Sequence, residues 1–284
     1  MRYALMLVFL IGMHCGSVYA QTDTTEAPSK KVTFTIGALY TNNANYYGQT
    51  AEKAMPYVAT AANVQFRSGF YLTGTAYRLL SDSGTFVSAS SAGAGFDFPI
   101  GKKLKADLSY SHTFYPADSR FLQAANSDNA SVSLKYKYWM TTGVNADYAF
   151  GKRNDMFVTL STEKQISLGS FAKGKDLITL TPSVDAVAGT QHFYQTYVQE
   201  RISQLSKLGL PIPILPGVPA NSQTVTEEST RFDLLSYNLR VPLAYNRSHY
   251  MLQVEYQLSV LSDNALSGAG TNHSFVNCSF YYQF

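Results

Sequence analysis

The chain has 284 residues, two cysteines, a formal net charge of +3 and 45% hydrophobic residues. This charge is too small for a nucleic-acid-binding surface, and no run of 18 apolar residues follows the start of the chain, so a helical membrane protein is excluded. Aromatic residues make up 14%, with 21 Tyr and 17 Phe against one Trp. That balance favours strands and the aromatic girdles of membrane interfaces.

Residues 1–20 are typical of a secretory signal peptide. A positive charge at the second position precedes a short apolar segment at 4–13, and Val18-Tyr19-Ala20 is a suitable cleavage motif. Cleavage removes Cys15 and leaves Cys278 alone, which excludes an intramolecular disulfide. The polar, Thr-rich segment 21–31 is expected to be a flexible periplasmic lead-in.

Beyond residue 31 the sequence alternates apolar and polar side chains in many short segments. The expected strands are 32–40, 56–66, 69–80, 86–98, 102–115, 130–139, 142–150, 155–166, 176–190, 231–243, 249–260 and 273–284. In 249–260, for example, Leu252 and Val254 lie on one face of the strand, and Gln253 and Glu255 lie on the other. This period of two predicts an all-β chain of twelve strands, within a range of 10–14. Most segments reach the 9–11 residues of a tilted transmembrane strand.

The connections alternate between short and long. Short ones follow the strands that end near residues 66, 98, 138 and 244, whereas the connections 41–54, 116–129, 191–230 and 261–272 are long. Bacterial membrane barrels have short periplasmic turns and long external loops. The pattern predicts a transmembrane antiparallel up-and-down β-barrel over 32–284, with both termini on the periplasmic side.

The last strand carries a family resemblance. One face of 273–284 is apolar or aromatic, and Phe280, Tyr282 and Phe284 alternate up to the end of the chain. This stretch resembles the closing strand of Gram-negative outer-membrane β-barrel proteins, whose assembly machinery recognises a terminal Phe with aromatics at alternate positions. The resemblance covers 32–284 and identifies no subfamily. It implies integral location in the bacterial outer membrane, Phe280, Tyr282 and Phe284 as assembly signal, and outer-membrane lipid, the barrel assembly machinery and periplasmic chaperones as partners.

The polar faces of the expected strands point into the lumen, and they carry charged side chains of both signs. These residues are Lys105, Lys135, Lys137, Arg240, Asp97, Asp107, Asp147, Asp185, Glu163 and Glu255. One interpretation is a set of internal salt bridges that compensates buried charge. The other is a charged constriction that selects a small polar solute. Neither sign is frequent enough to predict a preference for anions or cations.

The longest loop, 191–230, has an apolar face of its own. Val198, Ile202, Leu205 and Leu208 have helical spacing and are followed by an apolar, Pro-rich stretch at 210–216. We expect this loop to fold over the barrel mouth as a lid or to bind a surface partner; a disordered loop is the alternative.

An enzyme is the less favoured alternative. Some outer-membrane barrels are phospholipases with a lipid-facing Ser and His. His112 lies on the outward face of its expected strand, and pairing through the turn at 99–102 places it opposite Ser88 or Ser90. No third orienting residue is evident, and these three are weak catalytic candidates. The remaining histidines lack ligand spacing, so no metal and no cofactor is expected. Gly93 and Gly95 lie inside a strand, where they indicate a bend or a close approach.

The sequence therefore predicts a non-enzymatic barrel. Its expected role is a narrow or gated passive channel for small polar solutes. A structural or surface-interaction barrel with a plugged lumen is the alternative.

Overall fold

A computed structural model describes residues 32–51, 53–81, 86–116, 121, 126–172, 174–193, 231–265 and 270–284. The expected signal peptide and lead-in lie outside these residues. The strands are β1 (Val32–Thr41), β2 (Tyr57–Phe66), β3 (Phe70–Leu79), β4 (Ala89–Ile100), β5 (Leu104–Phe114), β6 (Asp128–Lys137), β7 (Thr141–Phe150), β8 (Asp155–Glu163), β9 (Ile166–Gly169), β10 (Asp176–Leu180), β11 (Ser183–Gly189), β12 (Asp233–Arg247), β13 (Tyr250–Leu261) and β14 (Asn272–Gln283).

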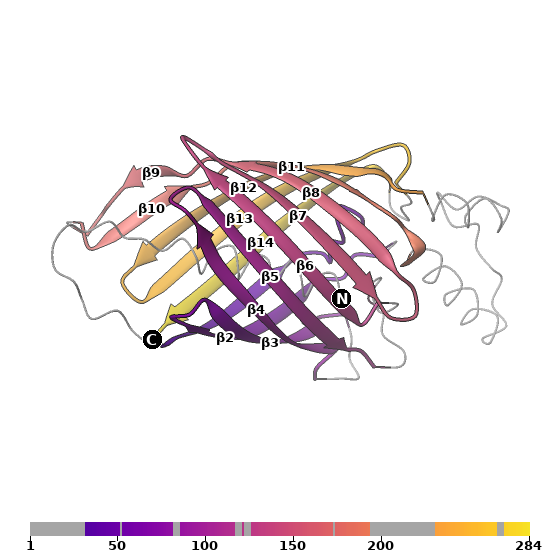
Figure 1. The fold of residues 1–284 in the computed structure, drawn as a ribbon, viewed down its shortest axis with the longest axis horizontal. Coiled ribbons are helices and arrows are strands. Elements are labelled where there is room, and N and C mark those ends of the chain that lie inside the picture. Colours follow the sequence, from indigo (N-terminus) through magenta and orange to yellow (C-terminus); the bar gives the residue numbers. More distant parts are fainter. Residues whose placement is uncertain are drawn as a thin grey trace, which may run out of the picture.

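The strands form one closed antiparallel barrel. Strands β1 to β8 pair in sequence order, β9 pairs with β10, β8 with β11, β12 with both β10 and β11, and β12 to β14 again pair in order. The pairing of β1 with β14, from Thr35↔Gln283 to Thr41↔Asn277, closes the sheet. Segments β8 and β9 run as one barrel strand and β10 and β11 as another, so the fourteen segments make twelve barrel strands. The predicted barrel, its strand number and its strand order are confirmed. The tilted strands wrap around the lumen, and the C-terminus lies at the same end as the turn between β12 and β13 (Figure 1).

The break between β10 and β11 has a local cause. Pro182 has no backbone N–H and cannot donate to the ladder. The chain bends there, while Thr181 N still donates to the Pro242 carbonyl and Lys164 N to the Pro182 carbonyl (both 3.1 Å). Pro242 itself does not interrupt β12, which pairs continuously with β13. Both prolines lack a backbone N–H, but only Pro182 interrupts its strand; β12 continues through Pro242.

The two faces of the wall differ as the alternation predicts. On β13, Val254 is 54% exposed and its neighbour Glu255 is 2% exposed. The last strand follows the same rule, with Val276, Phe280 and Phe284 exposed and Phe275 and Ser279 buried. An apolar outer surface around a polar interior is the inverse of a soluble protein and is typical of a barrel that spans a membrane. No helix within the described ranges is long and apolar enough to cross a bilayer.

Most connections also follow the predicted asymmetry; the connection 151–154 between β7 and β8 is short although it lies at the end of the longer loops. At the end that holds the C-terminus, short turns join β2 to β3, β4 to β5, β6 to β7 and β12 to β13. The other end carries the longer connections after β1, β5, β11 and β13. We call these the terminal end and the loop end.

Candidate functional site

The lumen is the candidate site, and the first connection enters it at the loop end. Residues Ala44–Ala51 follow β1 and lie in no strand, yet all eight are buried. Tyr46 and Gln49 are 0% exposed. A loop segment this deeply buried is held by the barrel wall around it, since loops otherwise run over the surface. We name Ala44–Ala51 the plug segment.

A tight turn shapes the plug segment. Tyr46 and Gln49 exchange two backbone hydrogen bonds (2.8 and 2.9 Å), and the two residues between them have positive φ angles of 50° at Tyr47 and 91° at Gly48. Positive φ at both central residues defines the two-residue hairpin turn of type I′. At Gly48 a Cβ would also lie 2.6 Å from the Ser236 hydroxyl, so glycine permits both the turn and the contact.

Tyr47 fixes the turn to the opposite wall. Its hydroxyl donates to Asp147 Oδ2 on β7 (2.9 Å), and its ring stacks on Phe157 of β8 with centroids 4.0 Å apart. Ser236 Oγ on β12 donates to the Tyr47 carbonyl (2.7 Å). In a ring of twelve strands β7 lies diametrically across from β1, where the plug segment begins. The segment therefore crosses the lumen.

A second set of contacts joins the plug segment to the start of the connection after β11. The rings of Tyr46 and Phe193 pack edge to face with centroids 4.4 Å apart. Gln49 Nε2 donates to Gln191 Oε1 (2.7 Å), and Gln191 Nε2 donates to the Asn264 carbonyl (2.9 Å). Residues from three connections thus meet at the loop end of the lumen.

Asp155, at the start of β8, holds this junction in place. Its carboxylate accepts hydrogen bonds from Thr190 Oγ1 (2.8 Å), the His192 and Phe193 amides (2.7 and 3.1 Å) and Asn126 Nδ2 (3.1 Å). The side chain is fully buried. Charged acceptors with several donors form the stronger class of hydrogen bonds, so the junction is firmly attached to the wall. The predicted helix and Pro-rich stretch of 191–230 lie outside the described residues.

The predicted luminal charges lie along the barrel wall, and one of them, Asp147, contacts the plug segment. Nine of the ten are at least partly buried, and only Lys137, at the end of β6, is exposed. Arg240 Nε pairs with Asp185 Oδ2 (2.9 Å) and Lys105 Nζ with Asp97 Oδ2 (2.6 Å). These two ion pairs agree with the first interpretation of the luminal charges. Selection of a solute by the same residues stays a prediction.

Two further luminal carboxylates are held by neutral donors. Tyr71 OH donates to both oxygens of Asp107 (3.2 and 3.0 Å), and Asn277 Nδ2 donates to Glu255 Oε1 (3.0 Å). Gly95 makes the first contact possible, because a Cβ there would lie 2.3 Å from the Tyr71 ring. The predicted close approach at Gly95 is confirmed.

The outer wall corrects the predicted pairing of His112. His112 lies opposite Ala92, and Ser90 lies opposite Phe114. Ser88 is buried, and its Oγ accepts a hydrogen bond from the Leu79 amide (3.0 Å). The predicted position of His112 opposite Ser88 or Ser90 was therefore wrong: the turn spans residues 101–103, which moves the register by several residues.

The structure also supplies the orienting residue that the sequence did not reveal. His112 Nδ1 lies 2.8 Å from Asp128 Oδ1, directly across the β5–β6 pair. Ser127 Oγ donates to Asp128 Oδ2 (2.8 Å), so this hydroxyl is directed at the carboxylate. His112 thus has an acidic partner. Within the described ranges no group of three or more His, Cys, Asp or Glu side chains could hold a metal ion.

The C-terminal aromatic residues lie at the barrel seam. Phe280 and Phe284 are exposed on the outer wall. Phe284 N donates to the Phe34 carbonyl of β1 (2.9 Å), and the two rings lie 5.4 Å apart. The last residue therefore takes part in closing the barrel.

Comparisons with known proteins give likeness of fold. The KdgM porin has a TM-score of 0.49 and 10% identity over 88% of this chain and 99% of its own. LpxR from Salmonella typhimurium has a TM-score of 0.48 and 7% identity, and the match covers 88% of this chain and 99% of LpxR. The COG4313 outer membrane channel from Pseudomonas putida F1 has a TM-score of 0.43 and 11% identity, and the match covers 93% of this chain and 100% of that channel. No family model and no curated protein sequence matches the chain.

Proposed function

We propose that this protein is an integral barrel of the bacterial outer membrane that acts as a gated passive channel for small polar solutes, without enzymatic activity. The terminal end faces the periplasm and the loop end faces outward. An apolar exterior and a polar, charged lumen support this proposal. The observation that carries it is the plug segment, which crosses the lumen and is attached there by hydrogen bonds of Tyr47, Gln49 and Ser236.

The attachments of the plug segment suit a gate. Each of the three hydrogen bonds contributes about 0.5–1.5 kcal/mol net, more where the acceptor is charged, because water can replace the protein partner. The stacking of Tyr47 on Phe157 adds roughly 0.5–1.5 kcal/mol beyond the burial of its rings. Contacts of this size break and re-form individually, which supports a segment that can open.

Single-channel conductance tests the gate. Thr41 and Tyr57 lie opposite each other across the β1–β2 pair, so a four-residue Gly-Ser linker can replace 43–55 without straining the hairpin. The purified wild type should show rare, short openings in planar bilayers, and the linker variant should conduct for most of the time. A linker variant that folds but stays silent would contradict the gate.

The alternative function is a structural or surface-interaction barrel whose lumen stays closed. The dense packing of Tyr46 on Phe157 and Phe193, all 0% exposed, favours it. In that case partner binding would depend on the loop 191–230. Deleting 195–225 should then abolish binding to a surface partner without creating conductance, whereas a lid would increase conductance when it is removed.

We further propose that Phe280, Tyr282 and Phe284 form the signal for the barrel assembly machinery and that periplasmic chaperones carry the chain to it. Their alternation on the exposed side of the closing strand supports this role. Mutating all three to Ser should reduce the amount of folded barrel in the outer membrane while the protein accumulates in the periplasm. Unchanged assembly would contradict the proposal.

A further inference from the structure

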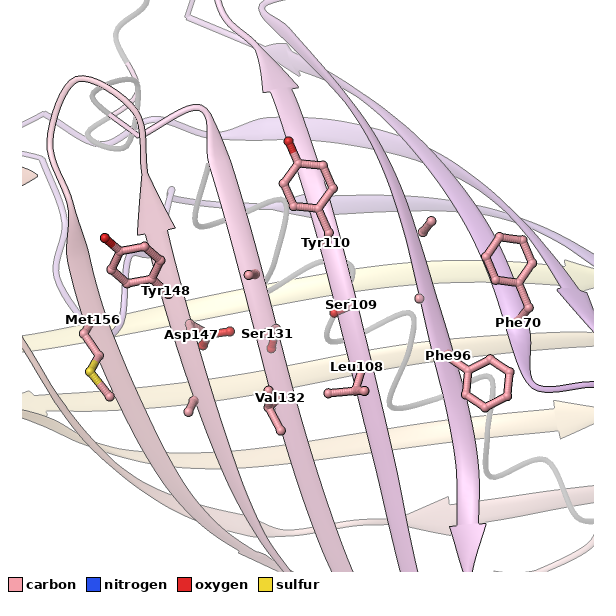
Figure 2. A pocket seen from close by; sticks show the side chains of 14 residues that line it. Phe70, Phe96, Leu108, Ser109, Tyr110, Ser131, Val132, Asp147, Tyr148 and Met156 are labelled. Carbon is pink, nitrogen blue, oxygen red and sulfur yellow. The ribbon is translucent and has the colours of Figure 1, made fainter.

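A shallow apolar groove runs across the outer wall from β3 to β8 (Figure 2). Its volume is about 720 Å³. Small side chains, Ala130 on β6 and Ala146 on β7, hollow the wall between larger ones. Ala130 lies opposite Tyr110 of β5 on one side and Tyr148 of β7 on the other. These two rings flank Ala130, and their hydroxyls point toward the same end of the strands (Figure 2). At that end the Phe150 ring of β7 lies 6.4 Å from the Tyr110 ring and 5.5 Å from the Tyr148 ring, measured between centroids.

A polar cluster lies beside the Tyr110 hydroxyl. Tyr110 OH donates to Asp128 Oδ1 (2.5 Å), and His112 Nδ1 contacts the same oxygen (2.8 Å). Asp128 precedes Ala130 by two residues, and His112 follows Tyr110 by two, so both lie about 7 Å further along the strands on the same outer face. Because Nδ1 is engaged by Asp128, Nε2 is the ring nitrogen that can contact a ligand. With Nδ1–H donating to Asp128, Nε2 can accept a hydrogen bond from a hydroxyl.

A carboxylate on a membrane-facing wall is costly unless it is compensated. Asp128 is compensated by three hydroxyl or imidazole partners, including Ser127. The wall therefore presents an apolar groove, and Tyr110 links it to an ordered set of hydrogen-bonding groups nearby. An amphiphile has the same sequence of properties, an acyl chain followed by a polar head.

We infer that this groove is a lipid-binding site that takes one phospholipid of the surrounding membrane. An acyl chain lies in the groove over Ala130 and Val132, and hydroxyl groups of the lipid head donate hydrogen bonds to His112 Nε2 and to the Asp128 carboxylate. The groove faces the bilayer, so acyl chains are its neighbours at all times. His112, Asp128 and Ala130 lie on the outer face of the wall, so substitutions at these positions leave the contact between Tyr47 and Asp147 in place.

Native mass spectrometry of the purified full-length protein tests the site with dipalmitoyl phosphatidylglycerol as the probe. The wild type should retain one lipid after detergent removal. Ala130→Phe fills the groove at this position and should reduce the retained fraction at least tenfold, while His112→Gln should reduce it about three- to tenfold. Ala38→Phe is the matched control, since Ala38 is an exposed alanine on the outer face of β1, and it should bind like the wild type.

Heat-modifiable gel mobility confirms that each variant is a folded barrel. If Ala130→Phe does not fold, Ala146→Leu narrows the same groove and should weaken retention by a similar factor. Equal retention by the wild type and a folded groove variant overturns the inference. A ladder of several lipids that is identical in all variants also overturns it, because it indicates only a general annulus of lipid.

Discussion

Removal of a single hydroxyl, in Tyr47→Phe, should open the plug segment. The substitution deletes the hydrogen bond to Asp147 and keeps the ring that stacks on Phe157. Asp147 retains the bond from Asn145 Nδ2 (2.6 Å), so its carboxylate is still partly satisfied. The lost bond is worth about 1–3 kcal/mol, depending on the charge of the acceptor. This corresponds to a rise of roughly 5- to 150-fold in the ratio of open to closed channels.

Single-channel recording in planar bilayers measures this ratio directly as the open probability. Asp147→Asn should raise it less than Tyr47→Phe, because an amide oxygen can still accept the tyrosine hydroxyl. Combining both substitutions should give less than the product of the two effects, since they remove the same contact. Tyr256→Phe is the control, because this exposed tyrosine lies on the outer wall. An open probability for Tyr47→Phe within twofold of the wild type would refute the assignment of this bond to the gate.

Four further outcomes follow from the wall and the lumen. Arg240→Met should lower the free energy of unfolding by about 3–5 kcal/mol, because it leaves buried Asp185 without its ion partner; in urea titrations Arg240→Met with Asp185→Leu should recover most of the loss, and no recovery would contradict the pairing. Gly95→Ala should cost about 1–3 kcal/mol in the same titration, because its Cβ would clash with the Tyr71 ring, and a neutral effect would show that the ring can move. Deleting Phe284 removes the backbone N–H at the seam and should slow folding into lipid vesicles, so an unchanged rate counts against its role in closure. Because Lys137 is exposed, six acids and three bases remain at least partly buried among the ten predicted luminal charges, so the reversal potential of the linker variant in a tenfold KCl gradient should lie on the potassium side; a chloride preference would contradict it.

The strands were predictable because each has a strict period of two that reflects one apolar and one polar environment. The same signal predicted the faces of β13 and β14 and the buried position of the luminal charges. The plug segment was not predictable in this way. Residues 44–51 have no periodicity, and their burial arises from contacts with β7, β8 and β12, which are remote in sequence. Two adjacent tyrosines before a glycine were the one local sign that this connection packs inside.

The His112–Asp128 contact was missed for a different reason. The strand expected at 130–139 begins two residues earlier, so Asp128 was assigned to a loop. The register of β4 against β5 was displaced because the turn was placed at 99–102 and not at 101–103. Strand boundaries depend on hydrogen bonds with neighbours, which side-chain alternation does not encode. Errors of two or three residues do not alter the fold, but they change which side chains face each other.

The path of the plug segment from β1 to β7 has a mechanical consequence. A cylinder of twelve strands without interior support flattens into an oval under lateral pressure, because bending the sheet costs less than stretching it. The plug segment joins two walls that would move apart along one axis of the oval and together along the other. It therefore links opposite sides of the barrel, and it opposes their separation as long as the bond between Tyr47 and Asp147 holds.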